Sequence, residues 1–292
     1  DDENDDEKLN LDGKGRDDSK VQAWVVLKGL LDTADPEARR IAAVERRILT
    51  TVNHPNIVKI RDYVTHEDDD YIVMEYVPGV SLHQLMEQRR GPLPPADAIR
   101  YVLRVLPALG YLHRRGLIYC DLKPDNIMVT SEDVKLIDLG GARRADDTVS
   151  GFLSTPGYRA PELEQEGARP AGVAGGGLPS VASDIFAVTR TLARLVLGRF
   201  KGFLKEYRHS LPPREEHEPL LTFESLDLLL RRGTAIDPAD RFESTTELAE
   251  ELTGVLYEIV SRTGRRVVPL ASRWFEPDIH PTGEAAPGGK RP

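Results

Sequence analysis

The residue types and spacing between Asp121 and Asp138 could support chemistry. Asp121 is followed by Lys123 two positions later and by Asn126 five positions later. Asp138 ends an apolar run twelve residues beyond Asn126 and stands two positions before a glycine. A carboxylate can orient or take up a proton, an ammonium neutralises negative charge, and carboxylate and amide oxygens are hard ligands for Mg²⁺. Taken singly, each acid or amide could be a turn residue and the lysine a solvated side chain, so the pattern has weight only as a set.

A second candidate site lies upstream. Lys28 lies in the apolar segment 21–31, which predicts a buried strand. A buried ammonium needs a partner because burying a charge alone costs several kcal/mol. The next segment predicts a helix whose apolar stripe carries a single charge, Glu45, which makes it the expected partner of Lys28. The alternative is that Glu45 pairs with Arg46 or Arg47 at the rim of the stripe.

These residues form an ordered set along the chain. A strand lysine (Lys28) precedes the polar loop 121–126, the Asp138-Leu-Gly turn and an Ala-Pro-Glu sequence at 160–162. This set resembles the signature of the protein kinase superfamily. Each element alone occurs by chance, whereas all four in order are specific. The resemblance covers about residues 21–264, and its details are most similar to the soluble bacterial serine/threonine kinases of the protein kinase G family.

The resemblance implies a fold and a reaction. The fold would be an α+β, two-lobed protein-kinase fold with a small strand-rich N-lobe, here truncated, and a larger helical C-lobe. The reaction would be Mg-ATP-dependent transfer of the γ-phosphate to serine or threonine hydroxyls of a protein. Asp121 would orient the acceptor hydroxyl, and Lys123 would neutralise the phosphoryl group. The implied catalytic set is Asp121, Lys123, Lys28 and Glu45.

The same resemblance implies a nucleotide site. Met74 would stand at the back of the adenine pocket, and Glu75 and Val77 would offer backbone hydrogen bonds to the ring. Val26 and Met128 would sandwich the ring, although each apolar residue could equally belong to the core. The implied ATP-binding set is Lys28, Val26, Met74, Glu75, Val77, Met128, Asn126 and Asp138, of which Asn126 and Asp138 would bind the metal.

Structural parts of the family are also matched. Glu162 and Arg241 would form an ion pair under the activation segment, and Asp184 would anchor the backbone of the catalytic loop. Thr155 precedes a Pro-Gly pair, which suggests a structural hydroxyl near the catalytic aspartate and lysine. His113 near the end of a helix would suit the helix dipole.

The chain departs from the family pattern at several points. The glycine-rich loop is missing, because residues 13–15 hold only two glycines and lie too close to Lys28. Cys120 stands where the family usually has arginine, and Tyr119 stands where it usually has histidine. Leu139 replaces a phenylalanine, which reduces ring packing.

Composition shifts and periodicity divide the chain into four parts. These are an acidic disordered tail or loop at 1–20, a partial N-lobe at 21–78, a C-lobe at 79–264 and a C-terminal linker at 265–292. Helices are predicted at about 95–115, 181–198, 222–233 and 244–263, and strands at 71–77, 127–129 and 134–137. The glycine-rich stretch 163–180 predicts a flexible loop and an insertion.

Composition excludes several classes of protein. The chain has 292 residues and a formal net charge of −9, with nine of the acidic residues in the first twenty. It lacks the basic patch of a nucleic-acid-binding protein. Its single cysteine rules out an intrachain disulfide and a multi-cysteine metal site. No apolar run is long enough to span a membrane, and no signal peptide is visible, so we expect a cytoplasmic protein. Since residue 1 is aspartate, we expect a fragment or a processed form.

Two functions from different classes remain open at this point. The retained polar set favours an enzyme that uses ATP and Mg²⁺ and acts on a protein substrate. The missing glycine-rich loop favours a pseudokinase, a binding or scaffold module with weak nucleotide binding. A truncated product that folds poorly is the third alternative.

Overall fold

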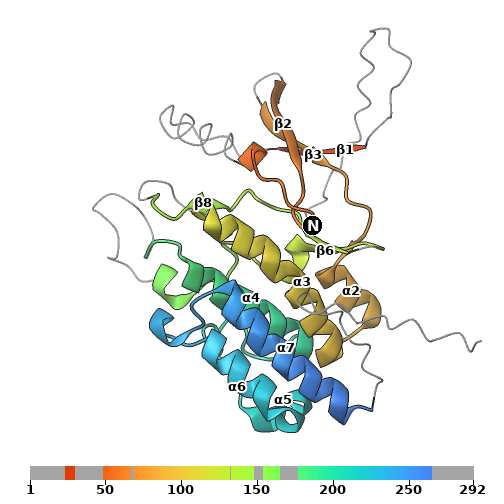
Figure 1. The fold of residues 1–292 in the computed structure, drawn as a ribbon, viewed down its shortest axis with the longest axis vertical. Helices are drawn as coiled ribbons and strands as arrows, with labels where there is room; N and C mark the ends of the chain where they lie inside the picture. Colours follow the sequence, from red (N-terminus) through yellow and green to blue (C-terminus); the bar gives the residue numbers. More distant parts are fainter. Residues whose placement is uncertain are drawn as a thin grey trace, which may run out of the picture.

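The computed structural model describes residues 24–29, 49–66, 69–131, 133–147, 154–164 and 177–264. A small sheet stands on a larger helical part, and the catalytic-loop residues lie where the two meet (Figure 1). Glu45, most of its predicted helix, the acidic tail, the C-terminal linker and most of the glycine-rich stretch lie outside the described residues, whereas Leu49 and Thr50 at the end of that helix are described as helical.

The small lobe contains a three-stranded antiparallel sheet. Its strands are β1 (Val25–Gly29), β2 (Ile60–His66) and β3 (Asp69–Glu75), in the order β1-β3-β2. The register places Lys28 opposite Ile72 on β3. Strand β3 begins and ends two residues earlier than the predicted 71–77, and β2 was not predicted. Its alternation is broken by an irregularity in register between Ile60 and Asp62, which obscures the pattern of a strand.

The prediction of a buried strand around Lys28 is wrong for β1. Val25 is 38% exposed and the side chain of Lys28 is 43% exposed. The reason lies in the sheet order, because β1 pairs only with β3 among the described strands and forms an edge. Valine and leucine in this strand reflect strand propensity more than complete burial.

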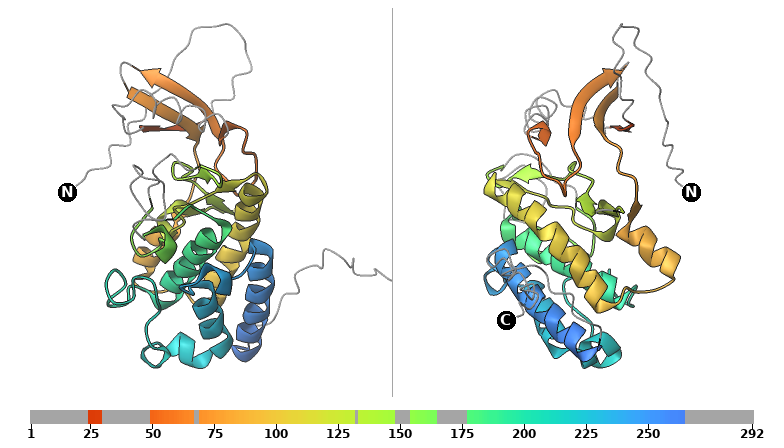
Figure 2. Two further views of the ribbon diagram at one scale, coloured as in Figure 1. Left: turned by 90° about the vertical axis from the view of Figure 1, so that its left-hand side faces the viewer. Right: turned by 45° about the vertical axis from the view of Figure 1, so that its right-hand side comes forward.

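The large lobe is helical. Its long helices are α3 (Pro95–Arg114), α4 (Val181–Leu197) and α7 (Thr245–Arg262), each within one residue of the predicted bounds. Helix α3 starts with proline at its first position, and α4 and α7 start after the capping serines Ser180 and Ser244. Helix α4 is buried along most of its length, with α3 beside it and α7 packed against α3 (Figure 2).

Shorter helices complete this lobe. Helix α2 (Leu82–Arg89) begins with a capping box between Ser81 and Gln84. The predicted helix at 222–233 is two helices, α5 (Glu218–Thr222) and α6 (Glu224–Gly233). They separate at Phe223, whose φ of −120° and ψ of 88° are not helical. Single 3₁₀ turns lie at η1 (Pro124–Asn126), η2 (Pro161–Leu163), η3 (Arg214–Glu216) and η4 (Pro238–Asp240).

Short strands carry the chain through the interface between the lobes. Strands β4 (Val80–Ser81), β6 (Ile127–Val129) and β7 (Val134–Leu136) form one sheet, and β5 (Leu117–Ile118) pairs with β8 (Arg143–Arg144). The prediction for 127–129 is confirmed, and that for 134–137 is one residue too long. The loop 121–126 therefore leaves β5 and enters β6, so strands hold it at both ends.

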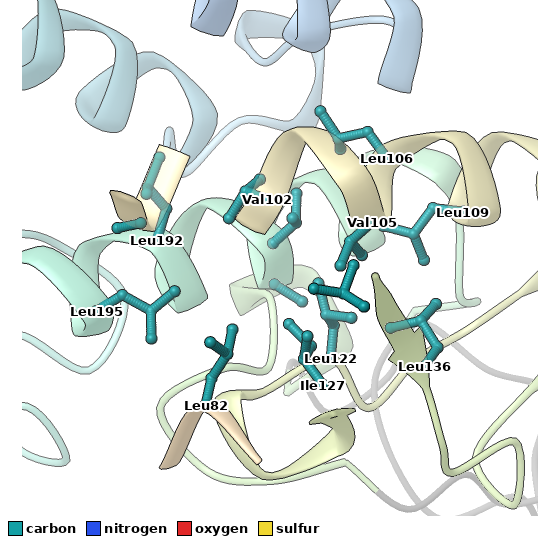
Figure 3. Close-up of a cluster of buried hydrophobic side chains, with 14 of the residues drawn as sticks. Leu82, Val102, Val105, Leu106, Leu109, Leu122, Ile127, Leu136, Leu192 and Leu195 are labelled. Atoms are coloured by element: carbon teal, nitrogen blue, oxygen red, sulfur yellow. The ribbon is translucent and has the colours of Figure 1, made fainter. Parts of the chain in front are cut away.

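A leucine-rich core packs against the loop 121–126 (Figure 3). Leu122, inside the polar loop, is fully buried and lies among side chains from α3, α4 and β7. Burying a leucine contributes about 1.5–3 kcal/mol. Labelled members of the cluster are Leu82, Val102, Val105, Leu106, Leu109, Leu122, Ile127, Leu136, Leu192 and Leu195.

Candidate active site

Asp121 lies at the centre of a hydrogen-bonded group. Lys123 Nζ donates to Asp121 Oδ2 over 2.9 Å, and both residues are partly buried. Thr155 Oγ1 lies 2.7 Å from Asp121 Oδ1 and 2.7 Å from Lys123 Nζ. The backbone N–H of Thr155 also donates to Asp121 Oδ1 over 3.0 Å. The prediction that Thr155 supplies a structural hydroxyl here is confirmed, and the three residues form one rigid set.

Asn126 is oriented by the same aspartate. Its Nδ2 donates to the Asp121 carbonyl over 2.8 Å and to Asp121 Oδ2 over 3.1 Å. The amide oxygen of Asn126 is not used in these two hydrogen bonds. An amide oxygen in this position is a suitable hard ligand for Mg²⁺.

Asp138 joins the large lobe to the small lobe. Its Oδ2 accepts a hydrogen bond from Lys28 Nζ over 2.5 Å, and its Oδ1 accepts one from the Gly140 N–H over 2.9 Å. Burial raises the pKa of Asp138, but the positive charge and hydrogen bond of Lys28 and the Gly140 N–H outweigh it. The net pKa lies below the ordinary value of 3.8. The carboxylate therefore stays charged and available as an anionic oxygen ligand.

The partner of Lys28 among the described residues is Asp138, not Glu45. The sequence predicted an ion pair between Lys28 and Glu45, and Glu45 lies outside the described residues, so that pair stays a prediction. Lys28 reaches across from β1 to a loop 110 positions later. Residue spacing alone did not predict the contact between Lys28 and Asp138.

The backbone of the loop is held by a buried carboxylate. Asp184 on α4 accepts hydrogen bonds from the N–H groups of Tyr119 (2.8 Å) and Cys120 (2.9 Å). This confirms the predicted anchor. His113 Nε2 lies 2.8 Å from Asp184 Oδ2, so the histidine assigned to the helix dipole also belongs to this anchor. A histidine in the last turn of α3 carries no sequence signal for a contact 71 positions away.

Cys120 has a strained backbone conformation within the loop. Its φ is 69°, a left-handed value that costs a residue with a Cβ about 1–2 kcal/mol. The hydrogen bond to Asp184 fixes this conformation directly. Burial raises the pKa of the Cys120 thiol well above its usual range, so the thiol is neutral and unreactive.

Tyr119 replaces the usual histidine beneath the site. It is completely buried, and burial together with the charges of Asp138 and Asp121 raises its pKa well above 10. Its hydroxyl therefore stays neutral. The ring fills space under the loop without adding charge to it.

The residues expected around adenine lie near one another. Val26 and Met74 are register partners on β1 and β3, and Met74 and Val77 are nearly buried. Val26 and Met128 both pack against the main core as partly buried side chains. The structure therefore permits both the adenine role and the core role for these residues.

Glu75 has a contact that the sequence did not indicate. Its Oε1 accepts from Lys135 Nζ over 2.5 Å and from the Lys59 N–H over 3.1 Å. The Glu75 N–H donates to the Lys59 carbonyl over 3.0 Å. The end of β3 is thereby fixed both to β7 and to the residue that precedes β2.

The ion pair below the activation segment is confirmed. Arg241 donates to both carboxylate oxygens of Glu162 over 2.8 Å, and the Arg241 side chain is fully buried. It also donates to the carbonyls of Ala182, Ala235 and Ile236. A bidentate guanidinium contact of this kind gives a fixed geometry as well as stability.

Asn126 and Asp138 are the two residues that the resemblance assigns to a metal ion. Within the ranges that the structure describes, no three His, Cys, Asp or Glu side chains are grouped for a metal ion. One carboxylate plus one amide, with water and phosphate oxygens, is nevertheless a common set for Mg²⁺. The two residues therefore fit this metal better than a transition metal.

A two-lobed fold with this loop, its anchoring aspartate and the Lys28–Asp138 contact defines a protein kinase domain. The chain matches the protein kinase domain family model over residues 14–215, more than half of its length, and it belongs to that family.

Two named relatives place the chain more closely. It is 46% identical over 260 residues to serine/threonine-protein kinase PknG of Mycolicibacterium smegmatis, an alignment of 87% of this chain and 32% of that protein. It is 44% identical over 246 residues to PknG of Mycobacterium leprae, covering 82% of this chain and 30% of that protein. The chain thus spans about a third of the length of these curated relatives.

A solved structure supports the fold. The crystal structure of the PknI kinase domain of Mycobacterium tuberculosis aligns with a TM-score of 0.60 and 30% identity. The alignment covers 80% of this chain and 85% of that domain. The predicted two-lobed kinase fold is confirmed.

Among the residues that the structure describes, no helix is long and apolar enough to cross a bilayer.

Proposed function

We propose that this chain is a serine/threonine protein kinase domain that transfers the γ-phosphate of ATP to hydroxyl groups of a protein substrate, with Mg²⁺. The observation that supports this proposal most is the hydrogen-bonded group formed by Asp121, Lys123 and Thr155. Asn126 is hydrogen-bonded to the same aspartate. Serine/threonine specificity is supported by the names of the two PknG relatives. A single thiol that needs no oxidising compartment supports a cytoplasmic location.

The proposed roles follow the geometry. The acceptor Oγ forms a bond to phosphorus while the bond to the bridging oxygen of ADP breaks, and Asp121 takes up or orients the acceptor proton. Lys123, already 2.9 Å from Asp121, neutralises charge on the transferring group. ATP with Mg²⁺ supplies the phosphoryl group. Asn126 and Asp138 would hold the metal, and Lys28 would contact phosphate oxygens.

Lys28 has one partner in the structure, Asp138, and two proposed ones, a phosphate group of ATP and Glu45. In the structure its ammonium is paired with Asp138, and the side chain is exposed enough to exchange that contact for phosphate. Glu45 is the proposed second partner. Val26, Met74, Val77 and Met128 would enclose the adenine, and the backbone of Glu75 and Val77 would offer hydrogen bonds.

The pseudokinase alternative is less well supported. It rests on the absence of a glycine-rich loop from the expected place in the sequence. A binding module has no need for a lysine and a threonine hydroxyl both fixed on the same aspartate. The retention of this geometry favours an enzyme, although backbone cover of the phosphates would be weaker than usual.

Calorimetric titration separates the two functions at the level of binding. ATP should bind in the presence of Mg²⁺ and lose affinity when Mg²⁺ is removed. Asp138→Asn should abolish most of this metal dependence, whereas the exposed control Asp97→Asn should keep it. Binding that is the same with and without Mg²⁺, or no binding at all, would favour the pseudokinase.

A further inference from the structure

A basic cavity lies between helix α2 and the C-terminal end of helix α4. Its volume is about 510 Å³, and three arginines, Arg90, Arg194 and Arg199, line it. His83 and Glu87 on α2 line it as well, and Glu87 is its only carboxylate. Glu87 Oε1 lies 3.3 Å from His83 Nε2, so this acid already has a neighbour. The cavity therefore carries a surplus of positive charge.

The walls of the cavity are fixed by the backbone. The Leu93 N–H donates to the Leu195 carbonyl over 2.8 Å, which ties the segment after α2 to α4. The Gly91 N–H donates to the Met86 carbonyl over 3.1 Å. Gly198 ends α4 with a φ of 70° and lies against Pro92. The backbone around the cavity is thereby held in place, and only the exposed arginine side chains would be ordered by a ligand.

Two of the arginines are available for a ligand. Arg90 and Arg199 are exposed, and within the described part of the chain neither has a carboxylate at ion-pair distance. Arg90 has a φ of 56°, a strained value for a residue with a side chain. Guanidinium groups bind carboxylates through paired hydrogen bonds. Converging arginines without acidic partners are suited to an anionic ligand.

The third arginine links the cavity to the catalytic loop. Burial lowers the pKa of the Arg194 guanidinium, which lies near Tyr158 and near Asp125 in that loop, two groups that raise it. The Tyr158 N–H donates to the Thr155 carbonyl over 3.1 Å, and Thr155 Oγ1 lies 2.7 Å from Asp121. The catalytic-loop turn η1 contacts both α2 and α4. A polypeptide with its hydroxyl at Asp121 would therefore have its flanking residues close to this cavity.

We propose that the cavity lined by Arg90, Arg194 and Arg199 binds acidic side chains that flank the phosphorylated residue of the protein substrate. This inference rests on the proposed kinase function and adds a substrate class to it. Glutamate or aspartate near the acceptor hydroxyl would pair with the exposed Arg90 and Arg199. Arg194 is a positioning residue, since it lines the cavity and lies near Tyr158.

Matched peptides test the proposal. One peptide carries a serine acceptor with glutamates moved stepwise along its flanks, and its partner carries glutamines at the same positions. The wild type should prefer the best glutamate peptide by about tenfold in kcat/KM, equivalent to about 1.4 kcal/mol. The double variant Arg90→Gln with Arg199→Gln should lose this preference through KM, with kcat on the glutamine peptide unchanged.

The control is a double variant with the same loss of charge elsewhere. Arg61→Gln with Arg262→Gln removes two exposed arginines of β2 and the end of α7, and it should keep the preference for glutamate. Equal rates of the wild type on both peptides, or a preference that survives loss of Arg90 and Arg199, would overturn the proposal.

A binding measurement separates this proposal from the kinase function. Fluorescence anisotropy with the labelled glutamate peptide needs no turnover. Wild type that binds the glutamate peptide no better than the glutamine peptide would refute the cavity assignment even if both are phosphorylated. Tighter binding that depends on Arg90 and Arg199, with no phosphorylation of either peptide, would support the cavity and count against the proposed enzyme.

Discussion

At the scale of single residues, Lys28 and Asp138 show how a charge can be held in place before its ligand arrives. The Asp138 side chain is partly buried, which by itself would raise its pKa. Its pKa nevertheless lies below the ordinary value because Lys28 and a backbone N–H stabilise the charged form. A depressed carboxyl pKa contributes stability that is complete above the unfolded-state pKa. That stability is lost as pH falls through the folded-state pKa.

This coupling gives a first prediction. Lys28→Met should raise the pKa of Asp138, because burial then acts without the charge that outweighs it. Carbon-detected NMR titration of the Asp138 carboxyl measures the change. In the variant, the acid-side loss of stability should begin at a higher pH. Lys135→Met, which removes a different paired lysine, is the control, and an unchanged Asp138 pKa in Lys28→Met would contradict the account.

The sequence predicted much of the candidate site but not its full set of contacts. Residue types and spacing predicted that Asp121, Asn126 and Asp138 act together, and the structure places them close to one another, while their roles stay a prediction. The contact of His113 with Asp184 was missed, because it depends on how α3 and α4 pack. Burial of β1 was predicted wrongly from composition alone, since sheet order decides which strand is an edge.

At the scale of elements, α4 holds the catalytic loop through Asp184. The side chain is 1% exposed, accepts two backbone N–H bonds and contacts His113. Removing its charge leaves at least one buried donor without a full partner. Elements of this kind matter because the loop contains the left-handed Cys120, whose conformation needs support.

Asp184→Asn should therefore loosen the loop. We expect a loss of about 1–3 kcal/mol in the free energy of unfolding, the cost of a buried unsatisfied group. Native-state hydrogen exchange should also become faster at the Tyr119 and Cys120 amides. Asp97→Asn, at an exposed pair on α3, should change neither quantity. Unaltered exchange at both amides would show that the loop is held by something else.

The activation segment gives a prediction about regulation. A phosphate on this segment orders it in many kinases by pairing with the arginine before the catalytic aspartate, and Cys120 cannot form such a pair. Arg143, whose charge is felt by Cys120, donates to the carbonyls of Gly140 and Ala142. Replacing Thr148, Ser150 and Ser154 together with alanine should leave the kinase rate within a few-fold, and a large loss restored by acidic residues would disprove this.

Helices were predicted well where the apolar pattern repeated over many residues. Helices α3, α4 and α7 have clear apolar faces and recognisable first turns, so their bounds were nearly correct. Helix α2 was missed because its eight residues hold few apolar positions, although the Ser81–Gln84 capping box marks its start. The division between α5 and α6 was missed because it depends on the backbone angles of Phe223.

At the scale of the whole molecule, the two lobes differ in how much of the described core they hold. The helical lobe holds most of the core and the buried Glu162–Arg241 pair. The small sheet has an exposed edge at β1 among the described strands, and Lys28 and Glu75 join it to the large lobe. Its buried residues Ile60, Ile72 and Met74 belong to the same hydrophobic core as the helices. The proposed nucleotide site therefore lies between two lobes that share one core.

Breaking the buried pair should affect the whole fold. Arg241→Met leaves Glu162 without its cation and should lower the free energy of unfolding by about 3–5 kcal/mol. Arg232→Met removes the same charge from the exposed Arg232–Glu247 pair and should cost no more than about 1 kcal/mol. Urea denaturation of both variants measures the difference, and equal losses would contradict the structural role assigned to Arg241.

The most direct test of the central claim is the rate of phosphoryl transfer by Asp121→Asn. The variant should lose about 10²–10⁴-fold in kcat on a serine- or threonine-containing protein, because Asp121 orients the acceptor and its proton. Its affinity for Mg-ATP and its unfolding free energy should stay close to the wild-type values. A purified Asp121→Asn protein that phosphorylates serine or threonine at the wild-type rate would contradict the account.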